Sequence, residues 1–266
     1  MKDFFDRLDA LYQSGRQAEV ESFLQETLQQ VSDGQKVTVL NELAGFYRGV
    51  SRYEDSVNAY LSALMLLDAA GQRDKPSYAT SGMNAAGTLR LAGRLSEAEE
   101  MFEHSLRLLD PEDYAYASAQ NNLAIVLQEQ GKFKEAEKLA EQALEWVRRH
   151  GAPAHEVATS LNNLANIRLS MGDAAGAASL VDEALRMYDS MPEANVHHAA
   201  ALSLKGCLCY RQKDWHGAQA AFEKALSLTE YFFGKNAEYK QTLRNLEEVK
   251  KAQKAFADEA AADLND

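Results

Sequence analysis

Asparagine side chains recur at a fixed interval in the middle of the chain. The block Asn-Asn-Leu-Ala occurs at 121–124 and again at 162–165, and Asn84 stands at the place that corresponds to Asn122. A carboxamide offers both a donor and an acceptor, so a row of them can pair with the backbone of a bound peptide of any sequence. The alternative is that these side chains hydrogen-bond between neighbouring helices and only hold them together.

Cysteine and histidine occur together near the C-terminal end, as His197, His198, Cys207 and Cys209. Residues two apart on an α-helix point roughly 200° apart, so the two thiols cannot face one metal ion. The other histidines are scattered, and neither a phosphate-binding glycine loop nor a nucleophile elbow is present. We therefore predict no catalytic residue, no metal site and no cofactor, and we do not expect an enzyme.

The composition narrows the classes of partner. The chain has 266 residues, of which 46% are hydrophobic, and a formal net charge of −12. An acidic chain is poorly suited to bind nucleic acid or anionic membranes. Two cysteines cannot form a disulfide framework, and no apolar run approaches the ~18 residues of a membrane span. The first residues are acidic where a signal peptide is apolar. These features predict a cytoplasmic protein with neither a nucleic-acid nor a membrane partner.

Apolar residues three and four apart, interrupted by glycine, predict a series of helical hairpins. The last of the predicted helices has a polar side and an apolar side, as a capping helix needs. The hairpins are expected at about 2–31, 37–68, 78–109, 113–149, 155–189 and 196–233, the capping helix at 237–256, and an acidic tail at 257–266.

Small residues stand at the same two places in successive hairpins. Such residues let two helix axes approach closely, because interaxial distance follows the side chains at the contact. Bulky Tyr60, Phe102 and Phe222 are expected to fill the space between hairpins. The first helices carry Ala44, Ala86, Ala124, Ala165 and Gly206, separated by 42, 38, 41 and 41 residues, and the second helices carry Ser56, Ala98, Ala136, Ala177 and Ala218.

This order of small residue, leucine or aromatic, glycine turn, alanine and aromatic resembles the tetratricopeptide repeat. The long period and the Asn-Asn-Leu-Ala blocks are most similar to the kinesin light chain type of array. Two departures are the missing tryptophan of the usual first helix and Arg168, which stands where leucine or an aromatic residue is expected. The resemblance implies an all-α fold, a right-handed α-solenoid that spans residues 1–256 as one domain.

The resemblance also implies that the first helix of each hairpin lines a concave surface that binds peptides. Counting from the buried small residues, the helical period places a set of polar side chains on that surface. The predicted ligand-binding residues are Arg48, Asn84, Arg90, Asn121, Asn122, Gln128, Asn162, Asn163, Asn166, Tyr210 and Arg211.

Arginines on this surface suggest the charge of the ligand. Arg48, Arg90 and Arg211 face it in an otherwise acidic chain, and arginine pairs well with carboxylates. An acidic peptide, or one with a free C-terminus, is therefore a candidate ligand. Glu42 and Glu129 lie close by and can neutralise these arginines instead.

We predict a non-catalytic scaffold or adaptor that binds a protein or peptide. Two alternatives stay open, namely a cytoplasmic regulatory peptide sensor that acts through a separate effector, and a structural protein that self-assembles as a homo-oligomer. The partner itself is not encoded in any pattern of this kind, because a fold does not fix a function.

Overall fold

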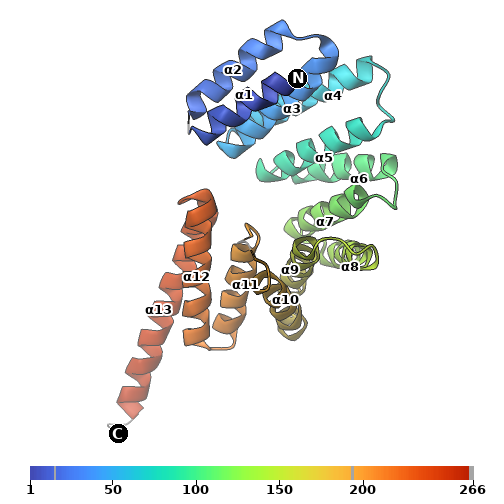
Figure 1. Cartoon of the computed structure of the whole chain (residues 1–266). Coiled ribbons are helices and arrows are strands. Elements are labelled where there is room, and N and C mark those ends of the chain that lie inside the picture. The colour runs from blue at the N-terminus through green and yellow to red at the C-terminus, as the bar shows by residue number, and fades with distance from the viewer. Residues whose placement is uncertain (15, 193–194, 264–266) are drawn as a thin grey trace. The chain divides into compact units, whose positions relative to one another are not determined.

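A computed structural model describes residues 1–14, 16–192 and 195–263, and its thirteen elements in those ranges are all α-helices (Figure 1). The chain divides into two compact units, residues 1–132 and 133–266, which we call the N-terminal and the C-terminal unit. The helices of the N-terminal unit are α1 (Lys2–Gln13), α2 (Gln17–Gln30), α3 (Asp33–Gly49), α4 (Tyr53–Ala69), α5 (Pro76–Leu91), α6 (Leu95–Leu108) and α7 (Tyr114–Glu129).

The C-terminal unit begins with the second helix of the fourth predicted hairpin. Its helices are α8 (Phe133–Arg149), α9 (Ala154–Ser170), α10 (Ala174–Asp189), α11 (His198–Arg211), α12 (Trp215–Phe233) and α13 (Ala237–Asp263). None of the helices in the described ranges is long and apolar enough to cross a membrane.

Successive helices pack against one another within each unit. In the N-terminal unit α3 packs on α4, α4 on α5 and α5 on α6; in the C-terminal unit α9 packs on α10, α10 on α11 and α11 on α12. The predicted all-α solenoid fold is thereby confirmed. The prediction that one solenoid domain spans residues 1–256 stays a prediction.

The turns inside the hairpins explain why glycine recurs. Gly93, Gly131 and Gly172 adopt φ values of 77°, 80° and 90°, the left-handed conformation that commonly ends a helix. Ser51 and Lys213 occupy the same place in their hairpins with φ of 62° and 60°. The backbone of this turn is therefore shared by the last five of the six hairpins, including the two that lack the glycine.

The predicted small residues lie at the crossing of the two helices of a hairpin. Ala165 of α9 and Ala177 of α10 are both completely buried in one apolar cluster. In the last hairpin Gly206 lies under the ring of Phe222, and an added Cβ would be 2.7 Å from the ring carbon Cε1. The interpretation of these positions as close helix crossings is confirmed.

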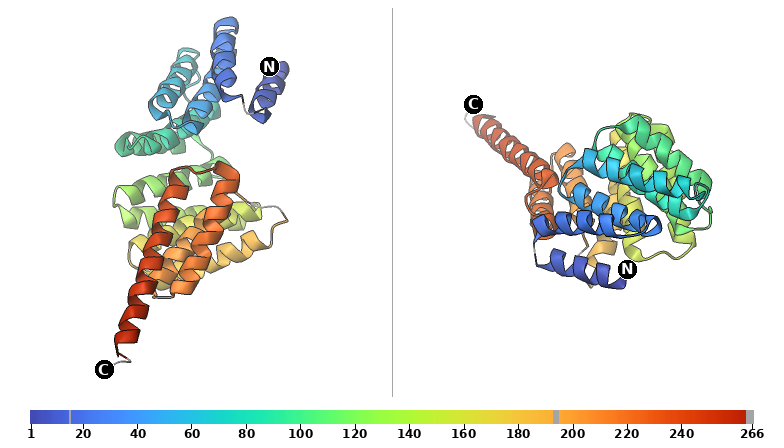
Figure 2. Two further views of the ribbon diagram at one scale, coloured as in Figure 1. Left: turned by 90° about the vertical axis from the view of Figure 1, so that its left-hand side faces the viewer. Right: turned by 90° about the horizontal axis from the view of Figure 1, so that it is seen from above.

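The capping helix is longer than predicted. It lies alongside α12 and ends at Asp263 rather than at 256 (Figures 1 and 2). The alanine-rich sequence beyond 256 contains no breaker and favours helix. On its apolar side Leu246 and Val249 are buried, and the buried residue one turn earlier is Thr242, whereas Leu243 is exposed.

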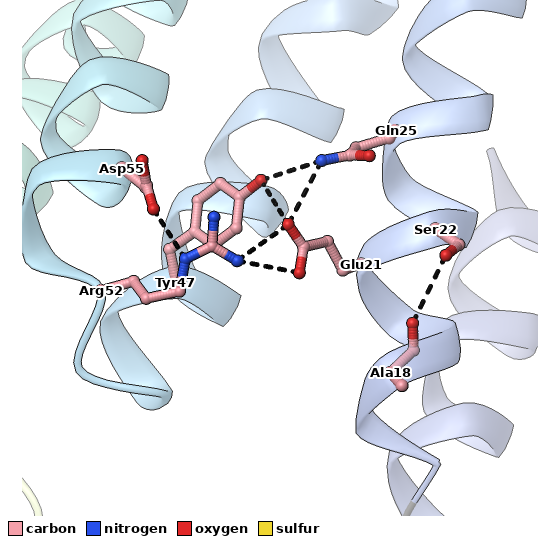
Figure 3. A network of polar contacts seen from close by, with 7 residues as sticks. All are labelled: Ala18, Glu21, Ser22, Gln25, Tyr47, Arg52 and Asp55. Atoms are coloured by element: carbon pink, nitrogen blue, oxygen red, sulfur yellow. Dashed lines mark hydrogen bonds and ion pairs between the residues drawn. The ribbon is translucent and has the colours of Figure 1, made fainter.

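A polar network joins α2, α3 and the start of α4 (Figure 3). The Arg52 guanidinium donates to both carboxylate oxygens of Glu21 at 2.9 Å and to Asp55 at 2.6 Å. It also lies 4.3 Å from the centre of the Tyr47 ring. The Tyr47 hydroxyl donates to Glu21 at 3.0 Å and accepts from Gln25 at 3.1 Å. These groups satisfy one another, so we interpret them as a brace between the first two hairpins.

Candidate functional site

The predicted arginines of the N-terminal unit differ in their surroundings. Arg48 is exposed on α3, whereas the half-buried Arg90 on α5 donates to Glu129 of α7 at 2.6 Å. The neutralisation of Arg90 by Glu129, one of the two alternatives, is therefore present in the structure. Glu42 faces Asp9, and burial together with that carboxylate raises the pKa of Glu42.

The carboxamides of the N-terminal unit lie half-buried on the first helices, as Asn84 on α5 and as Asn121, Asn122 and Gln128 on α7. The Nδ2 of Asn122 donates at 2.8 Å to the carbonyl oxygen of Ser118, one turn earlier in its own helix.

Asn41 of α3 occupies the place that corresponds to Asn121. Its Nδ2 donates at 3.2 Å to the hydroxyl of Ser81 on α5. This bond supports the alternative that carboxamides at this place brace neighbouring first helices.

The C-terminal unit contains a candidate site along one of its helices. Its central helix α11 contacts both α9 and α13. Two adjoining clefts follow α11 and share Asn166, Leu204, Cys207 and Asn245. We call them the His197 cleft, of about 470 Å³, and the Arg211 cleft, of about 390 Å³, and together the α11 trough.

Polar side chains from four helices line the His197 cleft, among them Ser203 of α11 and Thr229 of α12. Asn162 and Asn166 come from α9, and Gln241 and Asn245 come from α13. The buried Oδ1 of Asn162 has no hydrogen-bond partner among the described residues. A buried acceptor without a donor costs about 1–3 kcal/mol, so this oxygen can gain from a donor that enters the cleft.

The Arg211 cleft contains the two predicted residues of α11. Tyr210 is partly exposed and lies edge-on to Trp215, with ring centres 5.3 Å apart. Arg211 donates to the carbonyl oxygen of Leu169 at 3.2 Å, near the end of α9. Burial raises the pKa of the Cys207 thiol, so this cysteine is protonated at neutral pH and is a neutral part of the lining.

The paired histidines have separate roles that the sequence did not reveal. His197 lines its cleft, and desolvation of the ring lowers the pKa of His197. His198 is buried, stacks on Tyr188 with ring centres 5.3 Å apart, and has its Nε2 3.5 Å from Asp189. The Tyr188 hydroxyl bonds Thr159 at 3.0 Å, and burial raises the pKa of Tyr188 to about 12. His198 is thus a packing residue between α10 and α11.

The structure brings four of the eleven predicted residues together in the α11 trough, namely Asn162, Asn166, Tyr210 and Arg211. Asn163, although adjacent, lines neither cleft. The sequence analysis missed the contribution of the last helix. The signal was present, because four of the polar residues of α13 in the trough are spaced by three, four and three positions, which places them on one helical face. They are Glu238, Gln241, Asn245 and Glu248.

Comparison with known families agrees with this architecture. The sequence profile of the tetratricopeptide repeat matches residues 35–110 and 116–190, more than half of the chain. The chain therefore belongs to the tetratricopeptide repeat family. No curated protein sequence matches it.

Solved structures show the same fold at low sequence identity. BtubC (BKLC) from P. vanneervenii is 20% identical, with a TM-score of 0.63 over 86% of this chain and 93% of that chain. A putative kinesin light chain with nearly identical repeats from Podosopora anserina is 17% identical, with a TM-score of 0.61 over 76% and 98%. The apo form of RapI is 13% identical, with a TM-score of 0.63 over 95% and 75%. The predicted similarity to kinesin light chain arrays is confirmed for the fold.

Proposed function

We propose that the protein is a non-catalytic scaffold of the cytoplasm that binds an extended segment of a partner protein in the α11 trough. Tetratricopeptide repeats are generally a protein-interaction fold without catalysis, and this chain carries them over more than half of its length. The observation that carries the proposal is the pair of adjoining clefts along α11, where predicted binding residues from two helices meet.

The dimensions of the trough suit a short peptide. The trough follows α11 from His197, which precedes the helix, to Arg211, its last residue. Fourteen residues of α-helix are about 21 Å long, and an extended chain advances about 3.3 Å per residue. The trough therefore accommodates about six residues of an extended peptide.

The chemistry of the trough suits a peptide backbone. An extended chain presents N–H and C=O groups to both sides, and a carboxamide can accept a hydrogen bond from the N–H or donate one to the C=O. The unpartnered Oδ1 of Asn162 would accept a backbone N–H. Arg211, at the far end, would pair with an acidic group or a terminal carboxylate. The preference for an acidic or C-terminal group that we predicted thus applies to this end of the trough.

Selection from a random hexapeptide library displayed on phage tests the proposal, with the full chain as bait. We expect Asn166→Ala to weaken the enriched peptides by roughly two- to tenfold, the value of one net hydrogen bond of about 0.5–1.5 kcal/mol. Asn58→Ala, the same substitution at an exposed site on α4, is the matched control and should leave affinity unchanged. Absence of any enriched peptide would contradict the proposal, as would equal affinity in the Asn166 variant.

A further inference from the structure

We propose that α13 is a wall of the peptide site and that its Glu238 selects a basic side chain at the His197 end of the trough. This inference rests on the proposed function and adds the polarity of the ligand and the direction in which it lies. It also gives α13 a role beyond that of a cap that keeps the last hairpin soluble.

The position of α13 supports the first part of the inference. Thr242 of α13 is buried, and its hydroxyl lies 3.3 Å from that of Ser203 on α11, which fixes the helix against the floor of the cleft. Gln241 and Asn245 line the same cleft as Asn162 of α9. A bound chain between α9 and α13 would therefore meet carboxamides from both helices.

The charge at the His197 end supports the second part. Glu238 lines the cleft and forms no ion pair within the described residues. The neighbouring carboxylate Glu156 lies 3.3 Å from the imidazole Nε2 of His155. Desolvation lowers the pKa of His197, so this ring is mostly neutral at neutral pH. A carboxylate at the mouth of a cleft without its own cation favours lysine or arginine on the ligand.

The opposite end of the trough has the opposite polarity. Arg211 lines this end, and the carboxylate of Glu248 nearby forms an ion pair with Lys251, with Nζ and Oε1 2.7 Å apart. A peptide with its basic residue at Glu238 therefore places its acidic or C-terminal end at Arg211. Two complementary ends fix one direction of binding, because the reversed peptide would set like charges against each other.

The rest of α13 supplies a control. Lys240 is exposed and lines neither cleft, although it lies only two residues from Glu238 on the same helix. Neutralising Lys240 changes the charge of α13 without changing the trough. An effect of Glu238 that Lys240 does not share is therefore specific to the site.

The test uses the full chain and a library of N-acetylated, C-amidated hexapeptides in which each position is fixed in turn. We expect lysine and arginine to be enriched about fivefold at one terminal position, as for a partly exposed ion pair. Glu238→Gln should abolish this preference, and Lys240→Gln should retain it. Asn245→Ala should weaken all the bound peptides while leaving the preference intact. Circular dichroism establishes that each variant is folded.

Two results separate the inference from the proposed function. If the wild-type chain enriches no peptide, the proposed function fails, and this inference fails with it. If the wild-type chain enriches peptides but Glu238→Gln keeps the basic preference, or if Asn245→Ala binds as the wild type does, only the role of α13 is refuted. Enrichment of acidic residues at both ends would likewise overturn the assignment of Glu238.

Discussion

Replacement of Gly206 by alanine should destabilise the C-terminal unit, although alanine is the better helix former. Gly206 stands in α11, where the other first helices have alanine, and the ring of Phe222 occupies the space of a side chain. The added Cβ would lie 2.7, 2.8 and 2.8 Å from the ring atoms Cε1, Cδ1 and Cζ. Carbon atoms pack best at about 3.5–4.0 Å, so either the ring or the helix must move by roughly 1 Å.

The magnitude follows from two opposing terms. Overpacking of a core typically costs about 1–3 kcal/mol, and Phe222 is only 1% exposed, so its ring has little room to retreat. Alanine in place of glycine inside a helix returns about 0.5–1 kcal/mol. The net expectation is a loss of about 0.5–2 kcal/mol. The double variant Gly206→Ala, Phe222→Leu replaces the ring by a smaller side chain, and this should reduce the free-energy cost of overpacking.

Urea unfolding followed by circular dichroism measures the change. Gly87→Ala is the matched control, because a Cβ at this helical glycine of α5 meets no heavy atom within 4 Å. That variant should gain about 0.5–1 kcal/mol. The reasoning is refuted if Gly206→Ala is as stable as the wild type or more so, or if the penalty is unchanged when Phe222 is leucine.

Two further predictions concern charge in the C-terminal unit. Arg168→Ala should lower the free energy of unfolding by about 1 kcal/mol, because Arg168 donates to Glu137 at 3.0 Å and to Glu141 at 2.8 Å. The loss, measured by urea unfolding, should be smaller in high salt. A loss that is independent of salt would contradict an ionic origin. Burial and the nearby Lys224 lower the pKa of His198, so the unfolded chain takes up the proton first as the pH falls below about 6.5. The unit should therefore lose stability on acidification, less so in His198→Phe, and equal urea midpoints across this range in both proteins would refute the assignment.

The repeat pattern was sufficient to predict the fold because each hairpin needs the same few residues. A small side chain at the helix crossing and a left-handed turn are local requirements, and they recur at intervals of 38 to 42 residues. Helix ends were predicted less well. The third helix begins at Asp33 rather than near 37, and the side chain of Gln35 accepts from the Ser32 backbone N–H at 3.4 Å. This Ser-x-x-Gln pattern is a known start signal, so the earlier boundary was predictable.

The candidate site was only partly predictable, because a helical period shows on which side of a helix a residue lies but does not show which residue it contacts. Arg90 was predicted to face a ligand, yet its guanidinium donates to Glu129, thirty-nine residues away in sequence. Asn122 and Asn41 both lie on first helices, yet the Nδ2 of Asn122 donates to Ser118 of its own helix while that of Asn41 donates to Ser81 of the next first helix. Such differences depend on neighbouring helices and on rotamers, which no internal repeat encodes.

The most informative part of the chain for function is α13. Every hairpin packs on the next one, and the residues that recur in every hairpin serve this packing. Within the described residues α13 is the last helix, and it packs against α12 and α11. It places Glu238, Gln241 and Asn245 on the face that lines the His197 cleft. A helix needed only as a cap would require no carboxylate and no carboxamides on that face, since any polar residues keep an exposed surface soluble. We therefore propose that this face of α13 is the feature by which the array distinguishes its partner.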